Sequence, residues 1–294
     1  MKKNIAGSRG PRSWQAVPAA GGRAANIAGG RAAPIGVFDS GIGGLTVLKE
    51  IMAALPDEGT IYLGDTARVP YGIRSRETVQ RYSFECARFL LSKGIKLLVI
   101  ACNTVSAVAL KEIARMSQVP VIGVIEPGAR AALKVSKTGK VGVIGTEATI
   151  KSRAYERAVR RLGGRHKIQG LACPLFVPLA EEGWFDNEVA RLTAERYLGG
   201  LKGIDTLLLG CTHYPLLKPS IGKALGPGVA LIDSAVETAR ETKKLLKRRG
   251  IQSGSVGGRA TFFVTDSPER FKRLGERFLK RKINNVEVVS LEAQ

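Results

Sequence analysis

Short runs of apolar residues alternate with longer amphipathic stretches along most of this chain. The apolar runs end in Gly, Asp or Cys and are mostly apolar throughout, which is typical of strands buried on both faces of a parallel sheet. The stretches between them carry apolar residues at helical spacing. The predicted strands span residues 35–38, 60–63, 95–101, 119–124, 140–144, 205–209 and 229–232, and the predicted helices span 44–54, 75–93, 104–116, 147–162, 186–200 and 234–249. This order predicts an α/β protein with mostly parallel sheets.

The C-terminal region adds a strand, a helix and a last strand. Residues 260–264 form an apolar run, and Ser267 and Pro268 follow as signals for the start of a helix. A serine side chain caps helices and proline is favoured in the first turn, so we expect Ser267 to be the N-cap. Residues 286–289 are predicted to be an edge strand.

Two of the predicted strands end in nearly the same way. The run 95–101 leads into Cys102, Asn103 and Thr104, and the run 205–209 leads through a glycine into Cys211, Thr212 and His213. A helix is expected after each. In parallel sheets, ligands bind where strands end and helices begin. We therefore expect two pseudo-symmetric α/β lobes that place Cys102 and Cys211 on opposite walls of a cleft.

Two thiols on opposing walls suit the inversion of a carbon centre. Moving one proton across such a centre requires a base on one face and an acid on the other. A thiol has an unperturbed pKa of about 8.5, which a polar site and a helix N-terminus lower. The glycines at 41–44 lack the spacings of phosphate-binding loops and are expected to allow a tight turn from strand to helix.

Composition narrows the class of protein. The 294 residues are 44% hydrophobic, contain only four cysteines and hold no apolar run long enough to cross a membrane. A disulfide scaffold is excluded, and a reducing compartment is expected. Residues 1–33 carry six Lys or Arg and no acid, and we interpret them as a disordered basic arm. The segment could instead be an organellar transit peptide or the product of a start codon assigned too early.

Positive charge extends beyond the arm, because the net charge of the chain is +21 and the arm supplies only six basic residues. Two basic runs, at 240–249 and 268–282, fall on predicted helices. They are interpreted as solvated helix faces. The competing interpretation is a surface for an anionic partner such as nucleic acid.

Six motifs, taken together and in order, resemble the glutamate racemases of the aspartate/glutamate racemase family. They are FDSGIGG (38–44), GDTARVPYG (64–72), ACNTVSA (101–107), PLFVPLAEEGW (174–184), LLGCTHYPLL (208–217) and IDSA (232–235). The resemblance implies a racemase without a cofactor that interconverts L- and D-glutamate and supplies D-glutamate for bacterial peptidoglycan. It also implies a first lobe of residues 34–125 with about 234–294, and a second lobe of 126–233.

The resemblance assigns roles to single residues. Cys102 would take the α-proton from D-glutamate and Cys211 would take it from L-glutamate, with Asp39, Glu181 and His213 assisting the thiols. The residues that would contact the substrate are Asp39, Ser40, Tyr71, Gly72, Asn103, Thr104, Thr212 and His213. A cytoplasmic location, no membrane association and a homodimer are expected, and association with nucleic acid or DNA gyrase is a second hypothesis for the basic surface.

Zinc binding and action on aspartate are two competing hypotheses for the same residues. Cys102, Cys211, His213 and Asp39 have side chains that suit zinc, although their spacing is not that of a known zinc motif, and we expect no metal. A relative acting on aspartate would typically carry an acidic residue where this chain has His213. No lysine stands out as an anchor for pyridoxal phosphate, in agreement with the cofactor-free interpretation.

Overall fold

Ten strands form two parallel sheets in residues 30–254 and 256–291, the part of the chain that this computed structural model describes. Sheet A has six strands in the order β10-β9-β2-β1-β3-β4, and sheet B has four in the order β6-β5-β7-β8. Every strand pair is parallel, which confirms the predicted α/β class. The strands are β1 (Ile35–Asp39), β2 (Thr60–Gly64), β3 (Leu97–Ile100), β4 (Val121–Gly123), β5 (Lys140–Gly145), β6 (Lys167–Ala172), β7 (Thr206–Gly210), β8 (Ala230–Asp233), β9 (Ala260–Val264) and β10 (Val286–Val288).

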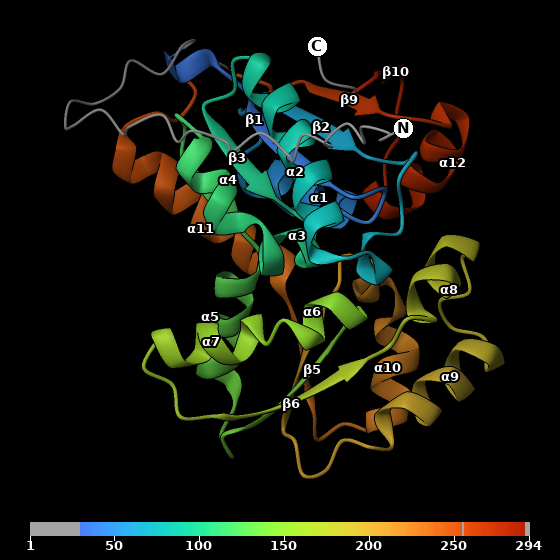
Figure 1. The fold of residues 1–294 in the computed structure, drawn as a ribbon. Helices are drawn as coiled ribbons and strands as arrows, with labels where there is room; N and C mark the ends of the chain where they lie inside the picture. The colour runs from blue at the N-terminus through green and yellow to red at the C-terminus, as the bar shows by residue number, and fades with distance from the viewer. Residues whose placement is uncertain (1–29, 255, 292–294) are drawn as a thin grey trace, which may run out of the picture.

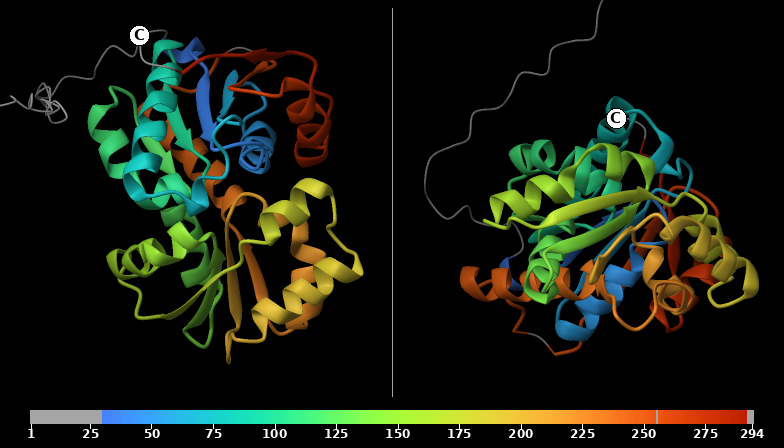
Figure 2. Two further views of the ribbon diagram at one scale, coloured as in Figure 1. Left: turned by 45° about the vertical axis from the view of Figure 1, so that its right-hand side comes forward. Right: turned by 90° about the horizontal axis from the view of Figure 1, so that it is seen from below.

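Helices cover both faces of each sheet (Figures 1 and 2). On sheet A, α1, α11 and α12 pack against one face and α2, α3 and α4 against the other. On sheet B, the two layers are α5 to α7 and α8 to α10. The α-helices are α1 (Leu45–Ala54), α2 (Arg76–Ser92), α3 (Asn103–Val108), α4 (Leu110–Met116), α5 (Ile125–Val135), α6 (Glu147–Lys151), α7 (Ala154–Arg161), α8 (Phe176–Glu182), α9 (Glu188–Leu198), α10 (Lys218–Leu225), α11 (Ser234–Arg249) and α12 (Pro268–Leu279). The 3-10 helices are η1 (Gly30–Ala32), η2 (Tyr71–Ile73) and η3 (Tyr214–Leu217). Within the described residues, no helix combines the length and apolarity needed to span a membrane.

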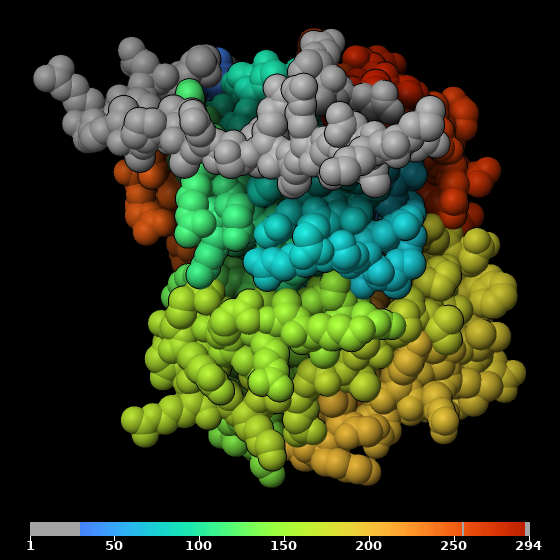
Figure 3. Space-filling view, viewed as in Figure 1, coloured from blue at the N-terminus to red at the C-terminus, as the bar shows by residue number. Residues whose placement is uncertain are grey.

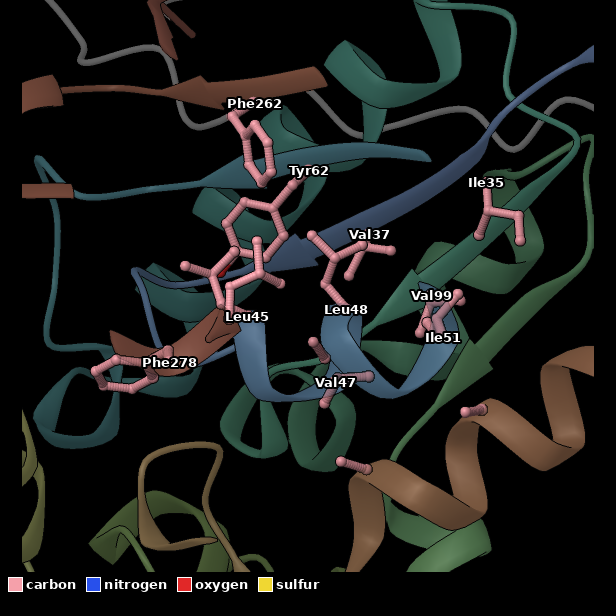
Figure 4. Close-up of a cluster of buried hydrophobic side chains, with 14 of the residues drawn as sticks. Ile35, Val37, Leu45, Val47, Leu48, Ile51, Tyr62, Val99, Phe262 and Phe278 are labelled. Carbon is pink, nitrogen blue, oxygen red and sulfur yellow. The ribbon is translucent and has the colours of Figure 1, made fainter. Parts of the chain in front are cut away.

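The strand β1 shows why its sequence is apolar throughout. All five of its residues are buried, and neighbouring side chains enter different cores. Val37 packs with Leu45 and Leu48 of α1, whereas Phe38 joins the core on the α2 side (Figure 4). A strand with helices on both faces has no solvent side, so hydrophobic and polar residues do not alternate along it.

The chain forms two lobes, each built around one sheet (Figure 1). The strands of the first lobe, around sheet A, come from residues 35–123 and 260–288, and those of the second lobe, around sheet B, come from residues 140–233. The space-filling view shows the lobes in contact along the face that it presents (Figure 3). The exact lobe boundaries given above stay a prediction.

The expected arm at 1–33 falls largely outside the described residues, which begin at residue 30. Its last part is ordered, because Gly30–Ala32 form η1. Arg31 Nε donates to the carbonyl of Gly250 at 3.0 Å, and the carbonyl of Arg31 accepts from Lys96 Nζ at 2.7 Å. These contacts tie Arg31 to the first lobe, and the extent of the arm stays a prediction.

Four elements were missed by the sequence patterns, and each has a physical reason. The strand β6 lies at the edge of sheet B, where half-exposed and exposed residues remove the apolar signature. The helices α5, α8 and α10 all contain a proline in their first turn, at Pro127, Pro178 and Pro219. Proline is tolerated there, because the first-turn N–H groups have no partner within the helix.

Three details of the predicted helices are corrected. The stretch 104–116 divides at Ala109 into α3 and α4. The stretch 147–162 divides into α6 and α7 next to Arg153, whose φ is 51°. Pro268 does lie in the first turn of α12, but Ser267 has a φ of 52° and its side chain makes no capping hydrogen bond. The strand β10 lies at the edge of sheet A, as predicted.

Candidate active site

The carboxyl ends of the two sheets face each other at the boundary between the lobes. Asp39 is the last residue of β1, Cys102 lies between β3 and α3, and Cys211 follows β7. The Thr212 hydroxyl donates to Asp39 Oδ1 at 3.5 Å, and the Thr46 hydroxyl of α1 donates to the Thr212 carbonyl at 3.1 Å. The two walls that the sequence predicts are therefore in direct contact.

Cys102 lies in a polar but nearly closed environment, with 5% of its surface exposed. Its thiol donates to the hydroxyl of Ser40 at 3.5 Å. Burial, and next the charge of Asp39, raise the pKa of Cys102 to about 12, although bonds from Ser40 and the Val105 N–H oppose the shift. The charge of Cys211 raises it further. Near neutral pH Cys102 is a protonated thiol.

Asp39 is completely buried beside that thiol. Its Oδ2 accepts from the N–H of Gly41 at 3.0 Å, and its Oδ1 faces the Thr212 hydroxyl. Burial raises the pKa of this carboxyl, and the charge of His213 is the largest opposing effect. Asp39 thus contacts both walls of the site.

Cys211 has a cationic neighbour. Its Sγ lies 3.9 Å from His213 Nδ1, and His213 Nε2 lies 3.2 Å from Glu181 Oε1. Burial alone lowers the pKa of His213, but the hydrogen bonds and charges of Cys211 and Glu181 outweigh it and raise the pKa to about 10. Burial alone raises the pKa of Glu181, but His213 and Arg270 hold it below its ordinary value. His213 is therefore an imidazolium near neutral pH, paired with a carboxylate.

A glycine allows the walls to approach. A Cβ placed on Gly43 would lie 2.3 Å from the Thr212 hydroxyl oxygen and 2.5 Å from His213 Nδ1. None of the glycines at 41–44 has a positive φ, so conformational freedom is not the reason for this one. The expectation of a tight turn is refined, because at Gly43 the missing side chain makes room for the opposite wall.

Asn103 and Thr104 connect the first lobe to helices of the second. Asn103 Nδ2 donates to the Tyr155 hydroxyl at 2.7 Å, whereas its buried Oδ1 has no partner among the described residues. The Thr104 hydroxyl lies 2.9 Å from that of Thr146. The unpartnered Oδ1 beside Cys102 is an acceptor that a ligand's ammonium group would satisfy.

Tyr71 and Gly72 face different parts of the molecule, and their contact with the substrate stays a prediction. The Tyr71 hydroxyl donates to the buried Asp65, within the first lobe. Gly72 instead faces the second lobe, since a Cβ on it would lie 2.6 Å from Thr146 Cβ. This segment therefore reaches the boundary between the lobes through Gly72 rather than through the tyrosine side chain.

The structure adds residues that the sequence did not indicate. Tyr155 and Thr146 hold Asn103 and Thr104, Thr46 holds Thr212, and Arg270 holds Glu181 at 3.0 Å. These residues come from helices or helix caps far away in the sequence, and no local motif marks them. One expectation is corrected as well, since the 3-10 helix η3, not an α-helix, comes first after Cys211.

Other cysteines and a surface hollow lie outside the set of candidate site residues. Cys86 and Cys173 are fully buried. The described residues contain no group of three or more His, Cys, Asp or Glu side chains placed to hold a metal ion. A surface hollow between the start of α12 and β10, lined by Glu269, Lys272 and Asn285 among others, includes none of the candidate site residues.

Proteins of one family resemble this chain over most of its length. Residues 35–242 match the family model described as Asp/Glu/Hydantoin racemase. A protein of Geobacter metallireducens named glutamate racemase is 58% identical over 263 residues, which cover 88% of this chain and 97% of that protein.

Solved structures of glutamate racemases also have this fold. Glutamate racemase isoform RacE1 from Bacillus anthracis superposes with a TM-score of 0.87 at 44% identity, covering 90% of this chain and 100% of that one. The glutamate racemase of Francisella tularensis, solved in complex with D-glutamate, superposes with a TM-score of 0.84 at 40% identity, covering 89% and 99% of the two chains.

Proposed function

We infer that this chain, which belongs to the Asp/Glu/hydantoin racemase family, is a glutamate racemase, an isomerase that interconverts L- and D-glutamate. One observation carries the proposed mechanism. Cys102 and Cys211 each lie just after a strand, in two sheets that face each other, and their charged neighbours differ: Asp39 for Cys102 and His213 for Cys211. Racemisation requires a base on one face of the α-carbon and an acid on the other, and two opposed thiols supply both.

In the direction from L- to D-glutamate, Cys211 acts as the base. Its sulfur lies 3.9 Å from the imidazolium of His213, a group within reach to exchange a proton with it. The thiolate takes the α-proton, and the electron pair of the C–H bond moves onto the substrate carboxylate as an enediolate. Cys102, a thiol of raised pKa, then donates its proton to the opposite face of the carbon.

The reverse direction uses the same groups with exchanged roles. Cys102 as thiolate removes the α-proton of D-glutamate, and the Cys211 thiol donates. Each turnover leaves the two cysteines in exchanged protonation states, so protons must return between substrates. Asp39 beside Cys102 and His213 beside Cys211 are the groups placed to carry them.

Polar groups around the thiols are proposed to hold the substrate. Asn103 Oδ1, buried and without a partner among the described residues, would accept from the α-ammonium group. The hydroxyls of Ser40, Thr104 and Thr212 are donors for the carboxylates. Because both thiols are at most 7% exposed, glutamate would enter only when contacts between the lobes open, and closure would then exclude water.

The deciding experiment follows optical activity in D₂O without an added cofactor. Reduced protein is incubated with D-glutamate and, separately, with D-aspartate, and circular dichroism and deuterium at Cα are measured. Loss of the glutamate signal with deuterium incorporation supports the proposal. Faster loss with aspartate would favour an aspartate racemase, and no change with either amino acid would contradict racemisation of both.

The cellular setting extends this proposal. D-Glutamate made by this chain would supply peptidoglycan synthesis, and the four free cysteines suit a cytoplasmic location. The basic faces of α11 and α12 stay a candidate surface for an anionic partner, and a homodimer stays a prediction.

A further inference from the structure

The helix α12 of the first lobe contacts the acid–base groups of the second lobe. It lies beside α8 across the lobe boundary (Figure 2). Phe278 packs edge-on against the His213 ring, with centroids 5.6 Å apart, and an Arg277 nitrogen would lie 2.6 Å from a Cβ on Gly183 at the end of α8. Arg270 completes the set through its bond to Glu181. One helix thus contacts the ring, the carboxylate and the end of the supporting helix.

The Glu181 carboxylate is shared between the lobes. Its Oε1 faces His213 Nε2 at 3.2 Å, and its Oε2 accepts from Arg270 at 3.0 Å. The Glu181 side chain is 18% exposed, so one face of the carboxylate is free to turn toward solvent. A carboxylate held at both oxygens keeps one orientation, whereas a carboxylate held only by His213 rotates about its terminal torsion.

The orientation of Glu181 matters because His213 acts on Cys211. The bond to Nε2 fixes the imidazole ring, which leaves Nδ1 directed at the thiol sulfur. If Glu181 were held less firmly, the imidazole ring would also be held less firmly, and its Nδ1 would no longer stay directed at the thiol sulfur. On the other wall, Asp39 and Ser40 lie next to Cys102 in its own lobe, and the second lobe reaches Asp39 through the Thr212 hydroxyl at 3.5 Å, with no part played by α12.

We propose that Arg270 is a positioning residue for the racemisation: by holding Glu181 Oε2, it fixes the Glu181–His213 pair that serves Cys211, and not the Cys102 wall. This inference rests on the proposed two-thiol function. It also makes the Cys211 wall complete only when α12 of the first lobe lies against α8 of the second.

The test uses Arg270→Gln in the full-length chain and isotope effects on both enantiomers. Because L- and D-glutamate are equally stable, kcat/KM falls equally in both directions, by about fivefold for a half-exposed ion pair. The kinetic isotope effects on kcat/KM distinguish the two walls. Slower proton transfer at Cys211 raises the isotope effect with α-deuterated L-glutamate and lowers the isotope effect with α-deuterated D-glutamate.

Two further variants make the result specific. Arg270→Lys keeps the charge and should recover most of the activity. Arg273→Gln removes the same charge from the same helix at a residue with no ion pair or hydrogen bond in the described part of the chain, and should match the parent enzyme. Unchanged isotope effects in Arg270→Gln, or equal effects of Arg273→Gln, would overturn the role of Arg270 while leaving the proposed function intact. A parent enzyme inactive on glutamate would remove both.

Discussion

The two walls of the site carry the same thiol in opposite electrostatic surroundings. Cys102 lies beside Asp39, and burial together with that carboxylate raises its pKa to about 12. Cys211 lies beside His213, whose own pKa is raised to about 10 despite its burial, so that the ring stays positive near neutral pH. One thiol therefore lies beside an acidic group and the other lies beside a cation.

This difference shows that a racemase needs no symmetry between its two bases. The substrates are mirror images of equal stability, but the protein groups that meet them are not. The shared architecture of two strand ends supplies the positions of the thiols, and the neighbouring residues supply the difference between them.

Removing either thiol should have the largest effect. Cys102→Ser and Cys211→Ser are each expected to lower kcat/KM by about 10³-fold or more, because a serine hydroxyl does not replace an acid–base group of this kind. Chiral chromatography after incubation with each enantiomer measures the loss.

The same two variants separate the walls. Cys102→Ser keeps Cys211 and should slowly exchange the α-proton of L-glutamate in D₂O without inversion, and Cys211→Ser should do so only for D-glutamate. Mass spectrometry of the recovered enantiomers detects the exchange. Exchange on the opposite enantiomer would reverse the assignment of the two bases.

Removing the cation on the Cys211 wall comes next. His213→Asn is expected to lower kcat/KM by about 10²-fold, because the thiolate loses the imidazolium beside it. As in Arg270→Gln, the isotope effect should rise with α-deuterated L-glutamate and fall with the D-enantiomer. If the isotope effects with the two enantiomers changed in the same direction, His213 would act on both walls.

The raised pKa of His213 also predicts a pH dependence. The imidazolium is lost as pH rises through about 10, so kcat/KM of the parent should fall there. The stabilisation of the fold by the charged ring is fully present below the ordinary pKa of 6.5 and is lost as pH rises through about 10. Urea unfolding at pH 7 and pH 10.5 measures this loss as a difference in the free energy of unfolding. The difference between the two pH values should be smaller in His213→Asn than in the parent.

Removing the anion on the Cys102 wall should lower kcat/KM less and should shift the isotope effects in the opposite direction. Asp39→Asn lowers the pKa of Cys102, because burial remains but the neighbouring negative charge is gone. We expect kcat/KM to fall about tenfold and the isotope effect to rise with α-deuterated D-glutamate. Thiolate absorbance, taken as a difference from Cys102→Ser, follows the pKa. A pKa that moves upward would contradict the electrostatic account.

The fold was largely predictable where packing leaves a local pattern. Strands such as β1 and β7 are buried on both faces, so their residues are apolar throughout and the sequence marks them. The strand β6 has lost that pattern because it lies at an edge. The helix α5 also has a proline in its first turn, but its N-cap is Val124, which gives no capping signal of the kind that Ser267 gives before Pro268.

The strand-end positions of the two thiols were predictable, but the residues that support them were not. Cys102 and Cys211 end strands, and strand ends can be read from the chain. Tyr155 and Arg270 reach the site only through the packing of helices from the opposite lobe, at 52 and 89 residues from their partners. Such contacts depend on the tertiary arrangement, so single-sequence reasoning has no signal for them.

The smallest effect is expected from residues 1–29, because every contact given above for the two walls is made by residues between Asp39 and Phe278. Deleting residues 2–29 removes five basic residues but keeps Arg31, which binds the Gly250 carbonyl. We expect kcat to stay within about twofold, and any change in kcat/KM to shrink as salt screens the attraction of anionic glutamate. A deletion that also removes residues 30–33 would break the Arg31 contacts and should lower the melting temperature instead. If the shorter deletion reduced turnover at high salt, the segment would have to act on one of the walls, and the isotope effects on the two enantiomers would identify which.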